Sequence, residues 1–423
     1  MNSTQKVQKI ASKLSGQKHL SAIRDGMAIA LPLIIIGSAF MIVGSFPIKA
    51  FNDFLTNLGI IDYINKASNA TFGFAGFAAT FGISYSLSKS YKVNGIFAGL
   101  ISLTSVILMT PLISAEEGSA FLFKYFGMTG LFVGIIVALI STEIYRTFIQ
   151  KNIRVKMPDT VPPNVEAAFS ALIPGMAITF FWFVILIIIE KLGVSNVHDL
   201  IALVIAKPLS YLTATLPGVI VIILFQCFFW FFGIHGAQVT GSVVDPLLFA
   251  QTDQNRLAFE AGKELPHIVT YEFLYNYVFP GGAGALIAIA ILLYFFSKSE
   301  ENKALGKLSL VPLSFQIAEP IIYGLPTVFN LRFIIPFVAS PVVNAIICYT
   351  VMYLGIVPKP IGAAVPWTTP PVIAGFLASG GSIAAALLNI ACIAIDILIY
   401  LPFFRADDKE KLKQEQSEVL KEE

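Results

Sequence analysis

The segment 308–330, LSLVPLSFQIAEPIIYGLPTVFN, contains the side chain with the strongest case for chemistry, Glu319. The segment is apolar enough to enter a bilayer, but Pro312, Pro320 and Gly324 interrupt it. Two short apolar arms around such a break predict a hairpin that enters the membrane and returns to the same side. Unwound backbone at that depth is tolerated only where protein buries it or where it lines a wet cavity, and an ionisable residue there is a functional-site candidate by default. We therefore predict that Glu319 lies at the floor of a substrate site.

A second group of candidates lies around the motif GIHG, in which His235 stands between two glycines at a predicted helix end. Trp230 precedes this histidine, and Trp367 lies in the later motif VPWTTPP. A carboxylate and an imidazole can hydrogen-bond the hydroxyls of a polyol, while an indole offers a flat apolar surface to a sugar ring. A lone histidine at a helix end is commonly an interfacial residue, but flanking glycines that permit close backbone approach favour a functional role. Together these side chains predict a site for an uncharged carbohydrate.

The composition is that of a membrane protein. The chain has 423 residues, of which 56% are hydrophobic and 13% charged, and a soluble domain carries about twice that charged fraction. Several windows of about twenty residues lack charge, which is the length a helix needs to cross a bilayer. The net charge of +2 gives no indication of nucleic-acid binding. The three cysteines are isolated in apolar surroundings, so we expect small core residues and no metal site, disulfide framework or cofactor.

The predicted fold class is an all-α polytopic membrane protein with about ten transmembrane helices, two re-entrant hairpins and interfacial amphipathic helices. The expected spans are 27–47, 69–87, 94–113, 128–148, 166–189, 216–234, 237–250, 277–296, 333–355 and 380–403. The seventh span is required by parity, because the lysine-rich segment 298–307 is expected in the cytoplasm. It places the segment 251–271, which includes Arg256, outside. The hairpins are expected near 308–330 and 356–379, and no cleavable signal peptide is apparent in the polar segment 1–25.

Four motifs, taken in order, resemble one known family. They are FWFFGIHG at 229–236, AEPIIYGLPTVFN at 318–330, IVPKPIG at 356–362 and VPWTTPP at 365–371. With them the chain resembles, over essentially its whole length, the enzyme IIC subunits of the bacterial phosphoenolpyruvate-dependent sugar phosphotransferase system, in the lactose/cellobiose/diacetylchitobiose family. The resemblance implies ten membrane helices, two hairpins and a homodimer formed largely through the first half.

The resemblance also implies a division of the chain. A cytoplasmic amphipathic segment, 1–25, precedes a scaffold and dimerisation half, 26–190. An interfacial linker, 191–215, leads to a substrate-binding transport half, 216–404, and a cytoplasmic tail, 405–423. Both termini are expected in the cytoplasm of a bacterial cell whose inner membrane holds the protein.

For the site, the resemblance implies sugar contacts by His235, Glu319, Trp230 and Trp367, to which we add Gly236 and Gln316. Glu319 and His235 are the expected catalytic pair, with Glu319 orienting the attacking hydroxyl. Many relatives have Asn just before the hairpin Glu, whereas this chain has Gln316 and Ala318 nearby, which leaves the choice of sugar open. A β-linked disaccharide of the cellobiose or diacetylchitobiose type is expected.

The implied mechanism is group translocation, in which a bound sugar is phosphorylated at the cytoplasmic face. The phosphoryl donor in such systems is a phosphocysteine on a IIB protein, and here it must be a separate subunit because no cysteine lies in a soluble domain. The basic residues Lys151, Arg154 and Lys156 either dock IIB or serve only as a topology signal. Membrane lipid is the remaining expected partner.

Two other functional classes remain open at this point. The first is a proton-coupled secondary sugar transporter that uses Glu319 as its proton carrier, since such folds also contain broken helices. The second is a membrane receptor without transport. Asp245 and Asp396 are second-rank candidates that either join the site or bond to neighbouring helices, and Glu143 and Arg146 are expected to form a local ion pair.

Overall fold

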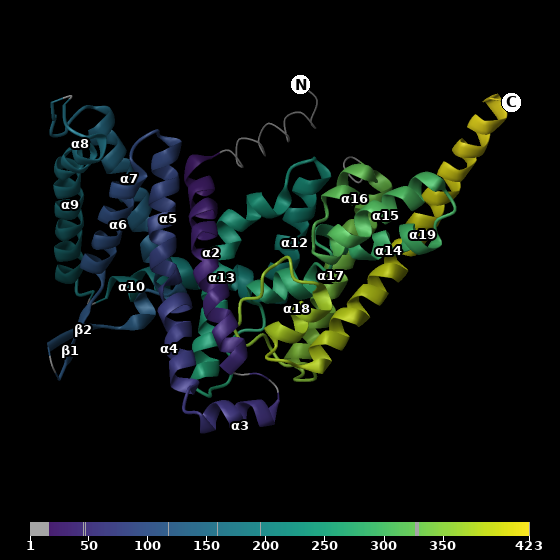
Figure 1. The fold of residues 1–423 in the computed structure, drawn as a ribbon, viewed down its shortest axis with the longest axis horizontal. Helices are drawn as coiled ribbons and strands as arrows, with labels where there is room; N and C mark the ends of the chain where they lie inside the picture. Colours follow the sequence, from purple (N-terminus) through teal and green to yellow (C-terminus); the bar gives the residue numbers. More distant parts are fainter. Residues whose placement is uncertain are drawn as a thin grey trace.

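The structure is a computed structural model, and it describes residues 17–44, 46, 48–116, 118–158, 160–194, 196–325 and 330–422. The expected all-helical class is confirmed, because the described strands are one short antiparallel pair, β1 (Leu112–Ala115) and β2 (Gly118–Phe121). Figure 1 shows the helices as a broad bundle that extends from α9 at one edge, past α2, to α19 at the other. The start of α2 and the last turns of α19 point toward the same end of the molecule.

The first half of the chain forms one helical bundle. Its helices are α2 (Lys18–Gly44), α3 (Lys49–Asn57), α4 (Ile61–Thr71), α5 (Ala75–Ser90), α6 (Gly95–Met109), α7 (Leu131–Gln150), α8 (Pro163–Ser170) and α9 (Leu172–Lys191). Short 3-10 turns η1 (Phe72–Phe74), η2 (Phe123–Tyr125) and η3 (Met128–Gly130) connect them. Buried hydroxyls join the central helices, with Ser84 Oγ 2.7 Å from Thr142 Oγ1 and 3.0 Å from Ser102 Oγ. Such bonds and small residues hold membrane helices together where lipid supplies no hydrophobic drive.

The second half is built from whole and broken helices. They are α12 (Leu216–Phe231), α13 (Gly236–Glu260), η5 (Phe273–Val278), η6 (Ala283–Ala285), α14 (Ile287–Phe296), α15 (Glu300–Ser314), α16 (Glu319–Gly324), α17 (Leu331–Tyr353), α18 (Pro371–Ala378) and α19 (Ile383–Glu422). The connection between the halves consists of α10 (Val197–Ile201), the π-turn η4 (Ala202–Ala206) and α11 (Lys207–Ala214). The expected linker is therefore helical, and it contains a π-turn before Pro208.

Five helical stretches are long and apolar enough to cross a membrane in the described ranges. They are Lys18–Gly44, Met128–Gln150, Pro163–Lys191, Arg332–Tyr353 and Ile383–Ser417. A sixth is the pair Phe273–Ala285 and Ile287–Phe296, which is bent by 55°. The eighth expected span, 277–296, is thus a broken helix. Two shorter apolar helices, Gly95–Met109 and Leu216–Phe231, lie at the third and sixth expected spans.

Several helix ends differ from the expected segment boundaries. Residues 1–16 lie outside the described part, but residues 18–25 belong to the continuous helix α2. The first hairpin begins at Glu300 and not near 308, because α15 includes most of the lysine-rich segment. The outer hairpin has an extended first arm before α18. The charged residues after Arg405 continue α19, where Asp408 accepts hydrogen bonds from the Ser297 hydroxyl and, at 2.8 Å, from the Lys298 N–H.

The largest correction concerns α13. The expected short span 237–250 is part of a helix that continues to Glu260, and the Arg256 side chain near the end of this helix is only 2% exposed. Its guanidinium lies 2.9 Å from Asp253 Oδ1 and 2.7 Å from Glu260 Oε1. It also donates to Asn69 Oδ1 of α4 at 3.0 Å. Arg256 therefore fastens the second half of the chain to the first through a buried ion-pair cluster.

Candidate functional site

The loop between α12 and α13 delivers His235 to a cavity. Gly233 has φ +76°, and the N–H groups of Gly233 and Ile234 donate back to Trp230 O and Phe229 O at 2.9 and 3.0 Å, which closes the end of α12. His235 is the N-cap of α13, and its Nδ1 accepts the Gln238 N–H at 3.2 Å. Since Nδ1 is an acceptor, the neutral ring carries its proton on Nε2, so this atom is free to donate into the cavity.

The tip of the α15–α16 hairpin delivers Glu319. The N–H groups of Gln316 and Ile317 donate to Leu313 O and Pro312 O, both at 3.0 Å, which ends α15. Glu319 is the first residue of α16, and Pro320 follows it. A proline in the first turn costs no helical hydrogen bond and fixes the backbone for helix formation. The predicted hairpin with Glu319 at its break is therefore present, although residues 326–329 of its return arm lie outside the described residues.

The two predicted catalytic side chains meet in one cavity. His235 Nε2 lies 3.8 Å from Glu319 Oε1, and their side chains are 36% and 45% exposed. The rings of His235 and Trp230 are 4.4 Å apart between centroids. Trp367 lies in the same wall, so the carboxylate, the imidazole and both indoles converge. The cavity has a volume of about 320 Å³ and is lined by Arg24, Gln226, Trp230, His235, Ala237, Gln238, Asp245, Tyr271, Tyr275, Phe279, Gly282, Ala283, Gln316, Ala318, Glu319 and Trp367.

Gly236 lies at the close contact between α13 and α12, next to the cavity. A Cβ atom at this position would lie 2.1 Å from Gln226 O and 2.8 Å from Trp230 Cδ1. The sequence predicted close backbone approach at this glycine, and the structure shows the approach to be between α13 and α12. Gly236 is not among the residues that line the cavity, so its close approach to α12 is a packing contact, and the predicted sugar contact stays a prediction.

We expect Gly236→Ala to weaken sugar binding without removing any group that touches the sugar. The added methyl forces α12 and α13 apart, and overpacking of this kind costs about 1–3 kcal/mol. Calorimetry on purified protein should show a weaker sugar affinity together with a lower unfolding temperature. Gly175→Ala is the matched control, since this glycine lies in α9 and its Cβ would meet only the Ile101 side chain, at 3.3 Å. An unchanged sugar affinity in Gly236→Ala would contradict this role.

Gln316 also lines the cavity, but its amide is engaged with backbone. Its Oε1 accepts the Gly282 N–H at 3.2 Å, and its Nε2 donates to Tyr275 O and Thr369 O, both at 3.4 Å. Its φ is +66°, a conformation that non-glycine residues rarely adopt. The side chain thus joins the hairpin tip to the broken helix and the outer hairpin, and the predicted sugar contact by Gln316 stays a prediction.

The two second-rank carboxylates lie in different places. Asp245 lines the cavity, and its Oδ1 accepts the Tyr275 hydroxyl at 2.8 Å. Asp396 is fully buried between α19 and α17, where its Oδ2 accepts the Asn344 Nδ2–H at 2.9 Å. Asp245 therefore belongs to the site and Asp396 bonds to a neighbouring helix. The tyrosines 271 and 275 were not among the predicted residues, although they follow the outer loop in a short aromatic run.

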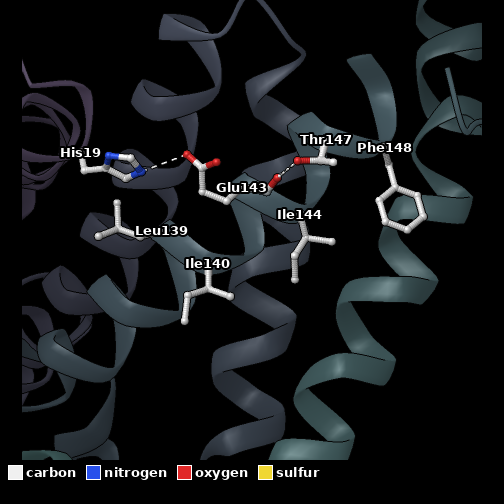
Figure 2. A pocket seen from close by; sticks show the side chains of 7 residues that line it. All are labelled: His19, Leu139, Ile140, Glu143, Ile144, Thr147 and Phe148. Atoms are coloured by element: carbon white, nitrogen blue, oxygen red, sulfur yellow. Dashed lines mark hydrogen bonds and ion pairs between the residues drawn. The ribbon is translucent and has the colours of Figure 1, made fainter. Parts of the chain in front are cut away.

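A second cavity, of about 560 Å³, lies in the first half and has different walls. Figure 2 shows that apolar side chains of α7 dominate it and that its polar groups face one another. His19 Nε2 lies 2.9 Å from Glu143 Oε1, and the predicted ion pair between Arg146 and Glu143 is present at 2.6 Å. Because the Glu143 carboxylate is already paired with His19 and Arg146, this cavity is less suited to binding a polyol than the cavity that contains Glu319. Trp182 also packs in this half and donates to Ser141 Oγ at 2.9 Å.

Fold and cavity together define a class of protein, a helical membrane transporter with a polar site walled by aromatic rings. The family profile "Phosphotransferase system, EIIC" matches residues 24–341. The chain belongs to this family of phosphotransferase-system permeases, as its motifs indicated.

Two relatives and one solved structure match this chain over nearly their whole length and nearly the whole length of the chain. It is 40% identical to the lichenan permease IIC component of Bacillus subtilis (strain 168), over 97% of this chain and 94% of that protein. It is 40% identical to the cellobiose-specific EIIC component of Geobacillus stearothermophilus, over 98% and 95%. The crystal structure of the transporter ChbC, the IIC component of the N,N'-diacetylchitobiose-specific phosphotransferase system, superposes with a TM-score of 0.92 at 38% identity, covering 97% of this chain and 98% of that one.

Proposed function

We propose that this permease binds a β-linked disaccharide of the cellobiose or diacetylchitobiose type and moves it inward as it is phosphorylated. The observation that supports this most is the convergence of Glu319, His235, Trp230 and Trp367 on one cavity. Relatives named for cellobiose and lichenan, and a solved structure named for N,N'-diacetylchitobiose, favour this group of sugars. Lactose is the next candidate.

In this proposal each side chain of the site has its own role. Glu319 accepts a hydrogen bond from the hydroxyl that is to be phosphorylated and so orients it. His235 donates from Nε2 to a neighbouring hydroxyl, because its Nδ1 is occupied by the Gln238 N–H. Trp367 is 46% exposed and offers its ring face to the sugar. Trp230 is buried beside His235 and contributes its indole to the inner wall of the cavity.

The rest of the machinery follows from the division of the chain. The first half, 26–190, serves as a scaffold and forms a homodimer, and the second half, 216–404, carries the sugar across the membrane. A separate IIB subunit docks at the cytoplasmic face, where Lys151, Arg154 and Lys156 form the proposed docking loop. Both termini lie in the cytoplasm of a bacterial cell, which agrees with α2 and α19 pointing to one end (Figure 1). Membership of the EIIC family does not support the proton-coupled alternative.

A binding panel tests the proposed substrate. Purified protein is titrated with cellobiose, diacetylchitobiose, lactose, maltose and glucose, and the heats are measured by calorimetry. We expect the β-linked disaccharides cellobiose or diacetylchitobiose to bind most tightly and the α-linked maltose to bind at least about tenfold more weakly, a difference of about 1.4 kcal/mol. Preference for maltose or for a monosaccharide would contradict the proposal.

Trp367→Ala should weaken disaccharide binding by about 10- to 100-fold, because the sugar covers the apolar ring face and burying a large apolar side chain contributes about 1.5–3 kcal/mol. Trp367→Phe keeps a ring and should recover most of the affinity. Trp182→Phe is the control, since this indole lies in the first half and donates to Ser141. Equal affinities of the alanine and wild-type proteins would show that Trp367 does not contact the sugar.

A further inference from the structure

Arg24 lies in the wall of the sugar cavity although the proposed sugar is uncharged. It comes from α2, in the first half of the chain, whereas Glu319 and His235 come from the second half. Among the lining residues that the structure describes, Arg24 is the one permanent cation. Hydroxyl groups can be bound by neutral side chains, so a neutral disaccharide alone gives no reason for a guanidinium here.

The local contacts of Arg24 leave part of its guanidinium accessible. Its Nε and Nη2 lie 2.9 and 2.8 Å from Oδ1 of the adjacent Asp25, and its side chain is 32% exposed. A guanidinium has five N–H donors in a planar fork that matches the oxygens of a phosphoryl group, and a single carboxylate oxygen uses only one edge of it. The remaining donors are available to an anion in the cavity.

The position of Arg24 along α2 is suited to phosphorylation of the sugar at the cytoplasmic face. It lies in the second turn of a helix that begins at Lys18, and this end of the molecule is also the end toward which α19 runs (Figure 1). This is the side on which the phosphorylated IIB subunit is proposed to dock. An arginine within a membrane helix is costly unless it faces protein or water and has a function.

We propose that Arg24 binds the phosphoryl group while it passes from the IIB phosphocysteine to the sugar. The sugar hydroxyl oxygen attacks phosphorus, a P–O bond forms, and the P–S bond breaks. The electron pair of that bond leaves with the cysteine thiolate of IIB, and the proton of the hydroxyl that Glu319 orients passes to an oxygen of the transferred phosphoryl group. The guanidinium stabilises the negative charge on the oxygens of the transferring phosphoryl group. Enzymes accelerate phosphoryl transfer mainly by positioning the reactants and by stabilising this charge. This step rests on the proposed function, including its phosphocysteine donor.

Arg24 belongs to the first half of the chain, whereas Glu319 and His235 belong to the second half. The Arg24 guanidinium therefore lines the sugar site only when the second half of the chain lies beside the start of α2. A sugar carried at any other level lacks the guanidinium, so phosphorylation is confined to the position seen in this structure. Release of a neutral sugar and transfer to it are thereby separated in space.

The test compares Arg24→Gln and Arg24→Lys with Arg332→Gln. Arg332 pairs with Glu410 at 2.9 Å and is not among the lining residues, so this control removes a charge without touching the cavity. Cellobiose affinity is measured by calorimetry, and kcat and the KM for phosphorylated IIB are measured in inverted membrane vesicles. We expect Arg24→Gln to bind cellobiose within about threefold of wild type, to keep the KM for IIB, and to lose about 10²–10³-fold in kcat, somewhat less than the loss of an arginine finger.

A second measurement does not depend on turnover. Cellobiose 6-phosphate should displace labelled cellobiose from wild-type protein at least about tenfold better than from Arg24→Gln, because charge-assisted bonds are about twice as strong as neutral ones. Arg24→Lys should recover part of both effects.

The inference on Arg24 is overturned if Arg24→Gln keeps its kcat, or if sugar affinity and kcat fall in the same proportion, which marks a structural or sugar-binding residue. A change confined to the KM for IIB would show docking in place of transfer. Failure of the proposed function is distinct, because wild-type protein would then not phosphorylate the sugar at all.

Discussion

Glu319→Gln is expected to lose sugar affinity and phosphorylation together. The amide keeps the shape of the side chain but replaces a charged acceptor, and hydrogen bonds to charged groups contribute about 1.5–3 kcal/mol. Calorimetry should therefore show cellobiose binding about 10- to 100-fold weaker than wild type. Because phosphoryl transfer depends more on positioning than on a strong base, the loss of kcat at saturating sugar should not exceed the loss of affinity.

The control for this substitution is Glu264→Gln, which removes a carboxylate that is 93% exposed and pairs with Lys359 at 3.5 Å. It should bind and phosphorylate sugar as wild type does. If Glu319→Gln bound sugar normally while transfer alone stopped, Glu319 would be a base and not a positioning group, and the proposed role would be wrong.

Arg256→Leu is expected to destabilise the protein more than any substitution in the sugar cavity. Removing this guanidinium leaves Asp253, 1% exposed, and Glu260, 20% exposed, without their partner. Breaking a buried ion pair from one side costs about 3–5 kcal/mol, because the remaining charge stays buried and unpaired. The bond to Asn69 and the contact with the Phe72 ring, 5.0 Å from the guanidinium carbon to the centroid, are lost as well.

Thermal unfolding of purified protein in detergent measures this effect as a fall in the midpoint. The double variant Asp253→Asn with Arg256→Leu should recover much of the loss, since the uncompensated buried charge is removed. Lys303→Leu is the control, because its partner Glu300 is 80% exposed and the pair lies at the surface. A midpoint for Arg256→Leu equal to that of the control would show that the cluster does not fasten the two halves.

The sequence predicted the members of the sugar site better than their surroundings. Glu319 could be found because a lone carboxylate at a proline break is rare and costly in a membrane segment. His235 could be found from its flanking glycines, and the structure explains both of them: Gly233 has a positive φ and Gly236 packs against Gln226. The hydrogen bonds of Gln316 could not be predicted, because its three backbone partners come from segments that only the folded chain brings together.

Arg256 shows why the outer boundary of α13 was misplaced. The seventh span is expected to end at residue 250, because charged residues follow its apolar stretch and usually lie outside the membrane. Yet Asp253, Arg256 and Glu260 are three and four residues apart, the spacing of ion pairs on one helix face. That local pattern could have extended the helix. Burial of the cluster against Asn69 could not have been predicted, since it depends on packing between the halves.

Uptake into proteoliposomes tests the central claim most directly. Purified permease is reconstituted with phosphorylated IIB inside, and labelled cellobiose is added outside. The label should accumulate inside only as the sugar phosphate, only when IIB is present, and equally after the pH gradient has been collapsed. Accumulation of free labelled sugar without IIB, stopped by collapse of the pH gradient, would contradict group translocation through the Glu319–His235 cavity.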